Sequence, residues 1–449
     1  MIKKYLHKLG FDKAIIFTST SSILNALGGV FSVFLVVKFM SNVEQGYYYT
    51  FGSIVAIQIF FELGLNAIIT QYAAHENAHL SINNKFELQG SIFHKSRISS
   101  LLRFSVKWYS FFSIFLIISL IIAGFIFFKK YNNTHIINWS FPWVLLAIGT
   151  SLNLFISPII AFLQGIGKVK EVARYQLIGQ IIRLLIVWVG LYFGLGLFVL
   201  GIASIFYFLI ISIIILNKYF KLLYNIFKIE ITEKISYVNE IFPFQWKIAI
   251  SWISGYFIFQ LFNPVLFATE GPQVAGQMGL TLAALNGILS LSLAWISTKV
   301  PLFSSLIAKK NYTELDSSFK LALKQSLGIN IFLLIILFLI IGSFHFFKIT
   351  IGGKYLSDRF LGFAPLFFMM IPIILNQLVA SWATYLRCHK KEPYLLNSIV
   401  GGILCTLSTL ILGNYYGVIG ITLGYMLLNI LMLPWSYQIF IKKRNEWHS

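Results

Sequence analysis

The sequence carries very little charge. Only 11% of its 449 residues are Asp, Glu, Lys or Arg, and only 15 of them are acidic. Soluble domains have roughly 25% charged residues, so this chain has too little polar surface to be soluble throughout. Hydrophobic residues make up 58% of the chain, and its mean hydropathy is +0.80. The composition therefore excludes a soluble enzyme of several average domains and is typical of a polytopic helical membrane protein.

The sequence also lacks several motifs that carry chemistry. Its two cysteines, Cys388 and Cys405, exclude a disulfide framework and a cysteine-based metal site. A phosphate-binding glycine loop is absent, so we expect no ATP hydrolysis by this chain and no cofactor. The first apolar run is too long for the hydrophobic region of a cleaved signal peptide, and we expect it to be a membrane span.

The long apolar runs predict about 12 transmembrane helices, each near the ~20 residues that cross a bilayer. The predicted spans are residues 14–38, 47–70, 106–128, 143–164, 174–194, 197–216, 247–268, 276–299, 324–347, 362–386, 395–413 and 418–440. Residues 90–107 mix apolar and basic side chains, which predicts a helix lying on the inner membrane interface.

The basic residues predict the orientation. Of 35 Lys and Arg, most fall in alternate loops when both termini are placed in the cytoplasm, as the positive-inside rule requires. The exceptions on the outer side are Lys38, Lys129, Lys130, Lys348, Lys354 and Arg359. The net charge of +20 is thus explained by topology, and we expect no nucleic-acid partner. The prediction is a multi-pass membrane protein with both termini in the cytoplasm.

An internal repeat predicts two halves. At an offset of 223 residues, matching residues in the fifth–sixth and eleventh–twelfth spans are Lys168 and Lys391, Gly179 and Gly402, Tyr192 and Tyr415, Gly194 and Gly417, and Gly201 and Gly424. A weaker alignment of the first and seventh spans pairs Gly46 with Gly276. An even number of spans keeps the repeats parallel. We predict two six-helix bundles around a central cavity, residues 1–216 and 247–449, joined by an amphipathic cytoplasmic linker, residues 217–246.

Polar residues inside the spans are candidate functional residues, because burying a charge in a bilayer is costly. Arg183 lies mid-span, and Gln176, Gln180 and Arg183 share a helix face at i, i+4 and i+7. Glu62 and Asn66 share a face of the second span, at a depth that matches Arg183. Two interpretations stay open: a water-filled lumen with Arg183 as an anion anchor and Glu62 as an ion-coupling group, or a buried Arg183–Glu62 pair that fixes packing.

Two further features have competing interpretations. Asn25 lies in a polar stripe of the first span, which either contacts substrate or joins helices. His75, Glu76 and His79 match the H-E-x-x-H pattern of zinc metalloproteases. A catalytic zinc needs a third protein ligand, and none is evident, so we expect a polar, solvated end of the second span and no metal site.

Several segments resemble the Wzx-type flippases that export polysaccharide repeat units. These segments are Met40–Thr70, Ile296–Leu315, Gly352–Tyr355 and Tyr416–Gly424, in the same order along most of the chain. Wzx-type flippases belong to the multidrug/oligosaccharidyl-lipid/polysaccharide exporter (MOP) superfamily, whose fold is two six-helix bundles.

The resemblance implies a membrane transporter and no enzyme. Its cargo would be an undecaprenyl-diphosphate-linked oligosaccharide for cell-surface polysaccharide such as lipopolysaccharide O-antigen, moved between leaflets by alternating access beside a partner polysaccharide polymerase. Arg183, Gln180, Gln176 and Asn25 would bind substrate, and Glu62 would couple an ion gradient. The alternatives are a cation-coupled multidrug exporter of the same superfamily, a lipid II flippase and, more distantly, a membrane metalloprotease.

Overall fold

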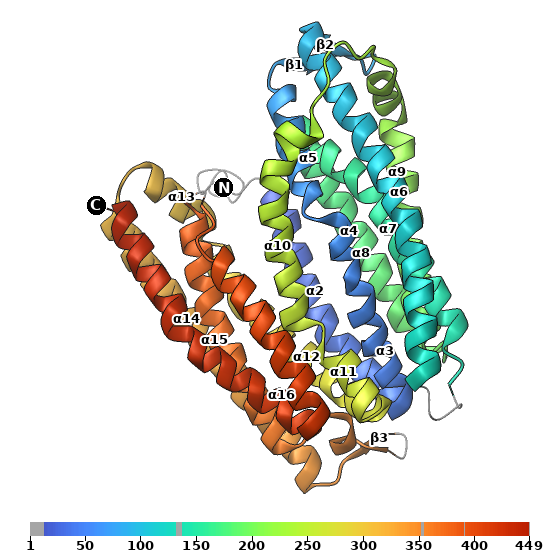
Figure 1. Cartoon of the computed structure of the whole chain (residues 1–449), viewed down its shortest axis with the longest axis vertical. Helices are drawn as coiled ribbons and strands as arrows, with labels where there is room; N and C mark the ends of the chain where they lie inside the picture. Colours follow the sequence, from blue (N-terminus) through green and yellow to red (C-terminus); the bar gives the residue numbers. More distant parts are fainter. Residues whose placement is uncertain (1–12, 132–136, 352–353, 390, 449) are drawn as a thin grey trace, which may run out of the picture. The chain divides into compact units, whose positions relative to one another are not determined.

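The protein is almost entirely α-helical (Figure 1). We analysed a computed structural model of the chain, which describes residues 13–131, 137–351, 354–389 and 391–448. Two short antiparallel hairpins are its β-structure in these ranges. Strand β1 (Leu80–Ile82) pairs with β2 (Leu88–Gly90), and β3 (Thr350–Ile351) pairs with β4 (Lys354–Tyr355).

The predicted membrane spans are confirmed as helices. Within the described residues, nine continuous helical segments are long and apolar enough to cross a membrane. Two of them, Ser140–Tyr192 and Leu395–His448, each contain two of the predicted spans. The first predicted span corresponds to α2 (Lys13–Phe39). The all-α polytopic class with about 12 spans is therefore correct.

Glycines divide the two longest segments. Between α7 (Ser140–Leu163) and α8 (Val169–Tyr192), a π-helical turn contains Gly167 with φ of 86°. In α16 (Leu395–His448), Gly417 has φ of 55° and ψ of −138°. Residues with a side chain rarely adopt such φ values, so glycine permits the chain to reverse direction there. Gly194, the repeat partner of Gly417, also has a positive φ of 75°.

Internal contacts group the chain into two units. The N-terminal unit comprises the described part of residues 11–21 and Ile54–Ile253, and the C-terminal unit comprises Ser22–Ser53 and the described residues from Ser254 onward. The second half of α2 and α3 (Asn42–Val55) up to Ser53 therefore belong to the C-terminal unit. Residues 217–228 of the predicted linker continue the helix Phe198–Lys228, and the division into residues 1–216, 217–246 and 247–449 stays a prediction. The arrangement of two six-helix bundles around a cavity stays a prediction.

The N-terminal unit is built around long neighbouring helices (Figure 1). Its elements are η1 (Ala56–Gln58), α4 (Ile59–Glu62), α5 (Leu65–Asn77), β1, β2, α6 (Ile92–Tyr131), α7, η2 (Gln164–Lys168), α8, α9 (Phe198–Lys228), η3 (Tyr237–Ile241) and the first part of α10 (Phe242–Phe259). Helix α7 packs on α6 and α9. Trp143 of α7 donates a hydrogen bond to the Leu120 carbonyl, 2.9 Å away, and lies against Gly124.

The predicted interfacial helix over residues 90–107 is wrong as a separate element. It forms the first turns of α6, which runs without a break for 40 residues. A helix of that length is about 60 Å long, roughly twice the thickness of the hydrocarbon core. Two basic residues of these turns, Arg97 and Arg103, contact the segment that follows α9, whereas the apolar Ile92 and Phe93 are exposed.

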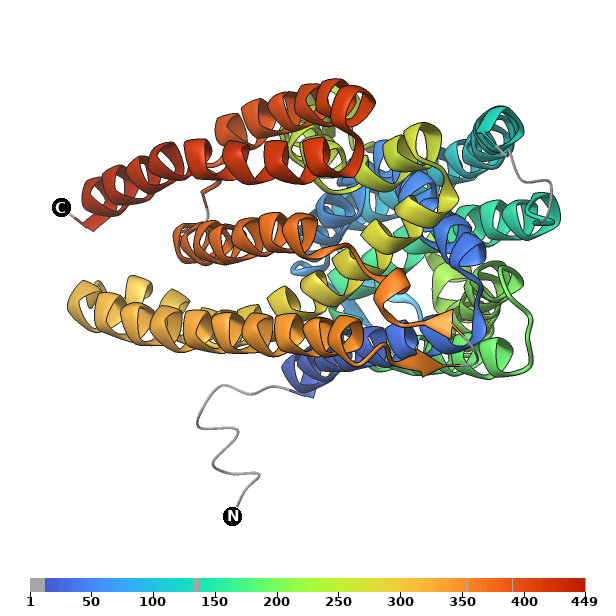
Figure 2. The same cartoon turned by 90° about the horizontal axis from the view of Figure 1, so that it is seen from below.

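The C-terminal unit contains the remaining helices (Figure 2). These are α11 (Phe262–Thr269), α12 (Pro272–Ser297), α13 (Val300–Ala308), α14 (Tyr312–Phe346), η4 (Ser357–Arg359), α15 (Phe363–Arg387) and α16, with the β3–β4 hairpin before η4. A hydrophobic core at one end of the unit includes Phe303, Phe319 and Tyr385. Hydrogen bonds between polar side chains join α12, α14 and α15. Ser292 donates to Gln377 at 3.0 Å, and Asn330 donates to Ser292 at 3.0 Å.

The two glycines that the weaker repeat alignment pairs are in direct contact. A Cβ on Gly276 of α12 would lie 2.8 Å from the Gly46 backbone nitrogen of α3. Beside them, the fully buried Arg359 donates to Gln45 Oε1 at 3.2 Å and to the Met40 carbonyl. Gln45 in turn donates to the carbonyl oxygens of Gly276 and Arg359. Small residues thus bring two helix backbones together, and a buried guanidinium ties them to η4.

Candidate functional site

The N-terminal unit contains a polar cavity of about 290 Å³. Helices α5, α7, α8 and α9 and the π-helical turn contribute its walls. The lining residues are Asn66, Ala67, Thr70, Asn153, Ile156, Ser157, Ile160, Ala161, Gln164, Gln176 and Tyr207. None of them is charged, and most of the polar ones are amides or hydroxyls. The cavity is therefore suited to a ligand that is recognised by hydrogen bonds.

A break in the second span lies just before the cavity residue Asn66. Leu63 and Gly64 both have left-handed backbones, with φ of 49° and 67°, so α4 ends and α5 starts in a new direction. Across this break, Asn66 Nδ2 donates to Glu62 Oε1 at 2.8 Å. The predicted pairing of Glu62 with Asn66 on one face is correct, although the span is not one continuous helix.

Two amide oxygens on the cavity walls lack hydrogen-bond partners. Asn153 Nδ2 on α7 donates to the Ser204 carbonyl at 3.0 Å and to Ser204 Oγ at 2.8 Å. Its Oδ1 atom and that of Asn66 are buried and accept no hydrogen bond within the described part of the chain. Buried acceptors without donors are costly.

Gln176, Gln180 and Arg183, which were predicted to share one face of α8, have different environments. Gln176 lines the cavity and accepts a long hydrogen bond of 3.5 Å from Gln164. Gln180 is buried and accepts a hydrogen bond from Ser21 of α2. Arg183 is exposed and interacts electrostatically with Tyr207, the residue of α9 that lines the cavity. The structure thus brings Gln176 close to Asn66 from the other predicted stripe.

The predicted alternative of a buried Arg183–Glu62 pair is wrong. Among the described residues, Arg183 forms no ion pair, and Glu62 is bonded to Asn66. Within that part of the chain, Arg183 is therefore a cation without a carboxylate partner. The side chain of Asn25, the fourth predicted substrate-binding residue, lies outside the described residues.

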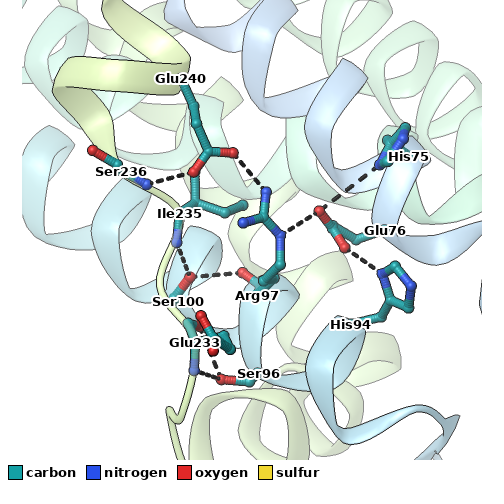
Figure 3. A network of polar contacts seen from close by, with 10 residues as sticks. All are labelled: His75, Glu76, His94, Ser96, Arg97, Ser100, Glu233, Ile235, Ser236 and Glu240. Carbon is teal, nitrogen blue, oxygen red and sulfur yellow. Dashed lines mark hydrogen bonds and ion pairs between the residues drawn. The ribbon is translucent and has the colours of Figure 1, made fainter.

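An ion network occupies the predicted inner end of the same unit (Figure 3). Glu76 is 1% exposed and accepts from Arg97 Nε at 2.8 Å and from His94 Nδ1 at 2.6 Å. Arg97 Nη2 also donates to Glu240 Oε2 at 2.6 Å. The forked guanidinium therefore joins the end of α5 to the segment that leads into α10.

This network corrects the interpretation of the H-E-x-x-H pattern. The end of the second span is solvated as predicted at His75 and His79, which are exposed. The Glu76 carboxylate between them is instead buried, in an ion pair with Arg97 and a hydrogen bond with His94. A carboxylate held in this way is not free to act as a general base. Within the described residues, no three side chains of His, Cys, Asp or Glu gather as metal ligands.

Glu240 gives the network a testable pH dependence. The hydrogen bond from Arg97 holds the pKa of Glu240 below its ordinary value of 4.5, although burial acts in the opposite direction. A carboxyl group with a lowered pKa stabilises the fold above its unfolded pKa, and this stabilisation is lost as pH falls through the folded value. We expect Glu240→Gln to be less stable than the wild type near neutral pH and equally stable well below pH 4.5. Unfolding midpoints across this range measure the difference. A gap that persists in acid would contradict the assignment.

Sequence reasoning missed the contribution of α7 to the cavity. Asn153, Ser157 and Gln164 follow one another at i, i+4 and i+11, a spacing that places them on one helix face. This spacing could have predicted a polar face on α7. The contacts of Glu76 with Arg97 and of Arg97 with Glu240 had no such signal, because they join segments far apart in the chain.

Comparison with known proteins supports the fold. No protein-family model matches the chain, and no curated protein matches it in sequence. Solved structures match nearly its whole length. The MATE multidrug transporter DinF-BH, solved in complex with a ligand, is 13% identical with a TM-score of 0.59, covering 96% of this chain and 94% of that one. A MOP superfamily transporter from Pyrococcus furiosus is 13% identical, with a TM-score of 0.58 and 96% coverage of both chains.

The lipid II flippase MurJ, in an inward closed conformation, also matches. It is 14% identical with a TM-score of 0.56, covering 96% of this chain and 90% of that one. At such low identity these likenesses concern the fold alone. The chain therefore has the fold of the MOP superfamily, which multidrug transporters and a lipid flippase share.

Proposed function

We propose that the protein is a flippase that moves undecaprenyl-diphosphate-linked oligosaccharide repeat units across the cytoplasmic membrane by alternating access. The observation that carries the proposal is the uncharged cavity, as the described residues form it, whose polar lining consists of amide and hydroxyl side chains. Sugars present many hydroxyl donors, and amide oxygens accept from them. The exposed Arg183 supplies a cation for a diphosphate group, which a guanidinium binds through two parallel hydrogen bonds.

The fold and the resemblance to Wzx-type flippases support the same proposal. The related fold of the lipid II flippase is consistent with a lipid-linked cargo. On this proposal the protein acts in polysaccharide biosynthesis in a bacterial inner membrane, beside a polymerase that joins the delivered units.

A cation-coupled multidrug exporter is the second candidate function. Glu62 favours it, because this carboxylate sits at the break before α5 and is bonded to the cavity residue Asn66. Exchange of a proton for a cationic drug requires a carboxylate at the site. DinF-BH, a multidrug transporter, has the same fold. Among the described residues, the cavity lining contains no carboxylate, and Glu62 is linked to it through Asn66. The uncharged lining fits neutral sugars better.

The test is complementation of a deletion strain. We expect loss of the gene to remove surface polysaccharide and to accumulate carrier-linked oligosaccharide in the inner leaflet. Wild type should restore both pools. Arg183→Ala should transport about tenfold less, because a charge-assisted contact with the diphosphate is worth at least about 1.4 kcal/mol.

Arg174 provides the matched control. It is an exposed arginine on the same helix, at the predicted inner end, and Arg174→Ala at equal expression should transport normally. Unchanged glycan pools in the deletion strain, together with hypersensitivity to cationic drugs, would replace the flippase by the exporter. Full rescue by Arg183→Ala would remove Arg183 from the binding site and keep the flippase.

A further inference from the structure

Helix α5 connects the cavity to the ion network. Asn66 and Thr70 line the cavity near its start, and Tyr72 and Glu76 lie toward its end. Thr70 also donates a hydrogen bond of 3.0 Å to the Ala161 carbonyl of α7. The helix has 13 residues, so it is a rigid rod of about 20 Å. A shift at one end is therefore transmitted to the other.

The start of α5 is a hinge in contact with α10. Leu63 and Gly64 have left-handed backbones, and Glu62 lies directly before them. A Cβ on Gly64 would lie 2.3 Å from Ile248 Cγ2, so α10 packs tightly against this point. A change in the Glu62–Asn66 contact acts directly on the hinge.

The far end of α5 is tied to Glu240 by two routes. Tyr72 Oη donates to the Glu240 backbone carbonyl at 2.8 Å. Glu76 reaches the Glu240 side chain through Arg97, with bonds of 2.8 and 2.6 Å. Glu240 lies two residues before the start of α10. Both the backbone and the side chain of Glu240 are therefore connected to α5 by hydrogen bonds.

The segment before Glu240 rests on α6 through backbone amides. Ser96 Oγ accepts from the Thr232 and Glu233 nitrogens, both at 2.8 Å, and Ser100 Oγ accepts from the Ile235 nitrogen at 3.1 Å (Figure 3). Hydrogen bonds of this kind protect amides from exchange with solvent. These amides are built-in reporters of how firmly the segment is held.

We propose that Glu240 is a positioning residue that couples the Glu62–Asn66 hinge contact, through α5, to the segment leading into α10. A change at the cavity moves α5, and its two links to Glu240 carry that movement to the start of α10. This inference takes from the exporter candidate only the assignment of Glu62 as the group that changes during transport. The coupling itself is measurable in protein without substrate.

The test compares hydrogen exchange in variants of the purified full-length protein. Glu62→Gln replaces the carboxylate by a neutral amide and alters the contact with Asn66. We expect it to change the exchange rate of amides 232–239 about fivefold, a coupling in the usual range for two linked sites. In the Tyr72→Phe/Glu240→Ala background, which removes the side-chain links, the same substitution should leave these amides unchanged.

Arg103→Gln is the matched control. Arg103 of α6 donates to the Phe227 carbonyl at 3.0 Å and the Ile229 carbonyl at 2.8 Å, so it holds the same segment from α6. In that background the response to Glu62→Gln should persist. A purely structural role for Glu240 predicts equal losses in both backgrounds.

Three results would overturn the proposal. The first is no response of amides 232–239 to Glu62→Gln in otherwise wild-type protein. The second is a response that survives loss of the Tyr72 and Glu240 links. Such a response would assign the coupling to the contact between Gly64 and Ile248 of α10. The third is an equal loss in Arg103→Gln. If the double variant does not fold, Tyr72→Phe and Glu240→Ala alone should each reduce the response. Failure of the flippase assay would leave these measurements intact.

Discussion

Replacing Arg97 by Met should destabilise the protein by about 3–5 kcal/mol, because it removes one partner from a buried ion pair. The Glu76 carboxylate is 1% exposed, and the substitution leaves near it only His94 at 2.6 Å and His75 at 3.8 Å, which carry a charge only when protonated. Methionine preserves the length and apolar stem of the side chain, so the effect isolates the charge. The free energy of unfolding in mixed detergent micelles measures it.

Arg387 is the control for this substitution. It pairs with Glu392 at 2.6 Å, but the two side chains are 53% and 43% exposed. Exposed ion pairs contribute at most about 1 kcal/mol, so Arg387→Met should have little effect. Glu76→Leu combined with Arg97→Met should cost less than Arg97→Met alone, since no unpaired charge is then buried. Equal losses for Arg97→Met and Arg387→Met would contradict the burial of the network.

Replacing Gly46 by Ala should destabilise the C-terminal unit by about 3 kcal/mol or more. The new Cβ would lie 1.8 Å from the Pro272 carbonyl oxygen, a backbone atom that cannot rotate away. Helices α3 and α12 would have to separate, which disrupts the contacts that Gln45 makes with Gly276 and Arg359. A lower unfolding midpoint in detergent and a lower yield of folded protein measure the loss.

Gly52 provides the matched control on the same helix. A Cβ at this position meets nothing within 4 Å, and alanine is favoured over glycine inside a helix by roughly 0.5–1 kcal/mol. Gly52→Ala should therefore be neutral or slightly stabilising. If Gly46→Ala behaved like Gly52→Ala, the close approach of α3 and α12 would be incorrect.

The cavity was only partly predictable from the sequence. Gln176 and the Glu62–Asn66 pair were identified as polar residues inside apolar spans, and the structure brings Gln176 and Asn66 to one cavity. Asn153 and Ser157 were overlooked, although their spacing on α7 indicates a common face. Arg183 was identified as well, but its alternative pairing with Glu62 did not form. Matching depth in the membrane does not specify which helices are neighbours.

Glu76 shows why motif spacing alone misleads. The H-E-x-x-H pattern states only that three side chains follow one another near a helix end. The residues that contact Glu76 and Arg97 in space come from α6 and from the segment before α10, 18 residues or more along the chain. These neighbours convert a pattern typical of zinc chemistry into a buried ion network.

The class of protein, the positions of the spans and the glycines at which the chain reverses can all be predicted from the amino-acid order. These features depend on local quantities: the length of apolar runs, the distribution of basic residues and the backbone freedom of Gly167 and Gly417. The choice of which polar groups meet depends instead on how the helices pack. In a membrane, side chains that face lipid and side chains that face protein are both apolar, so the sequence carries no amphipathic signal for the packing of one helix on another.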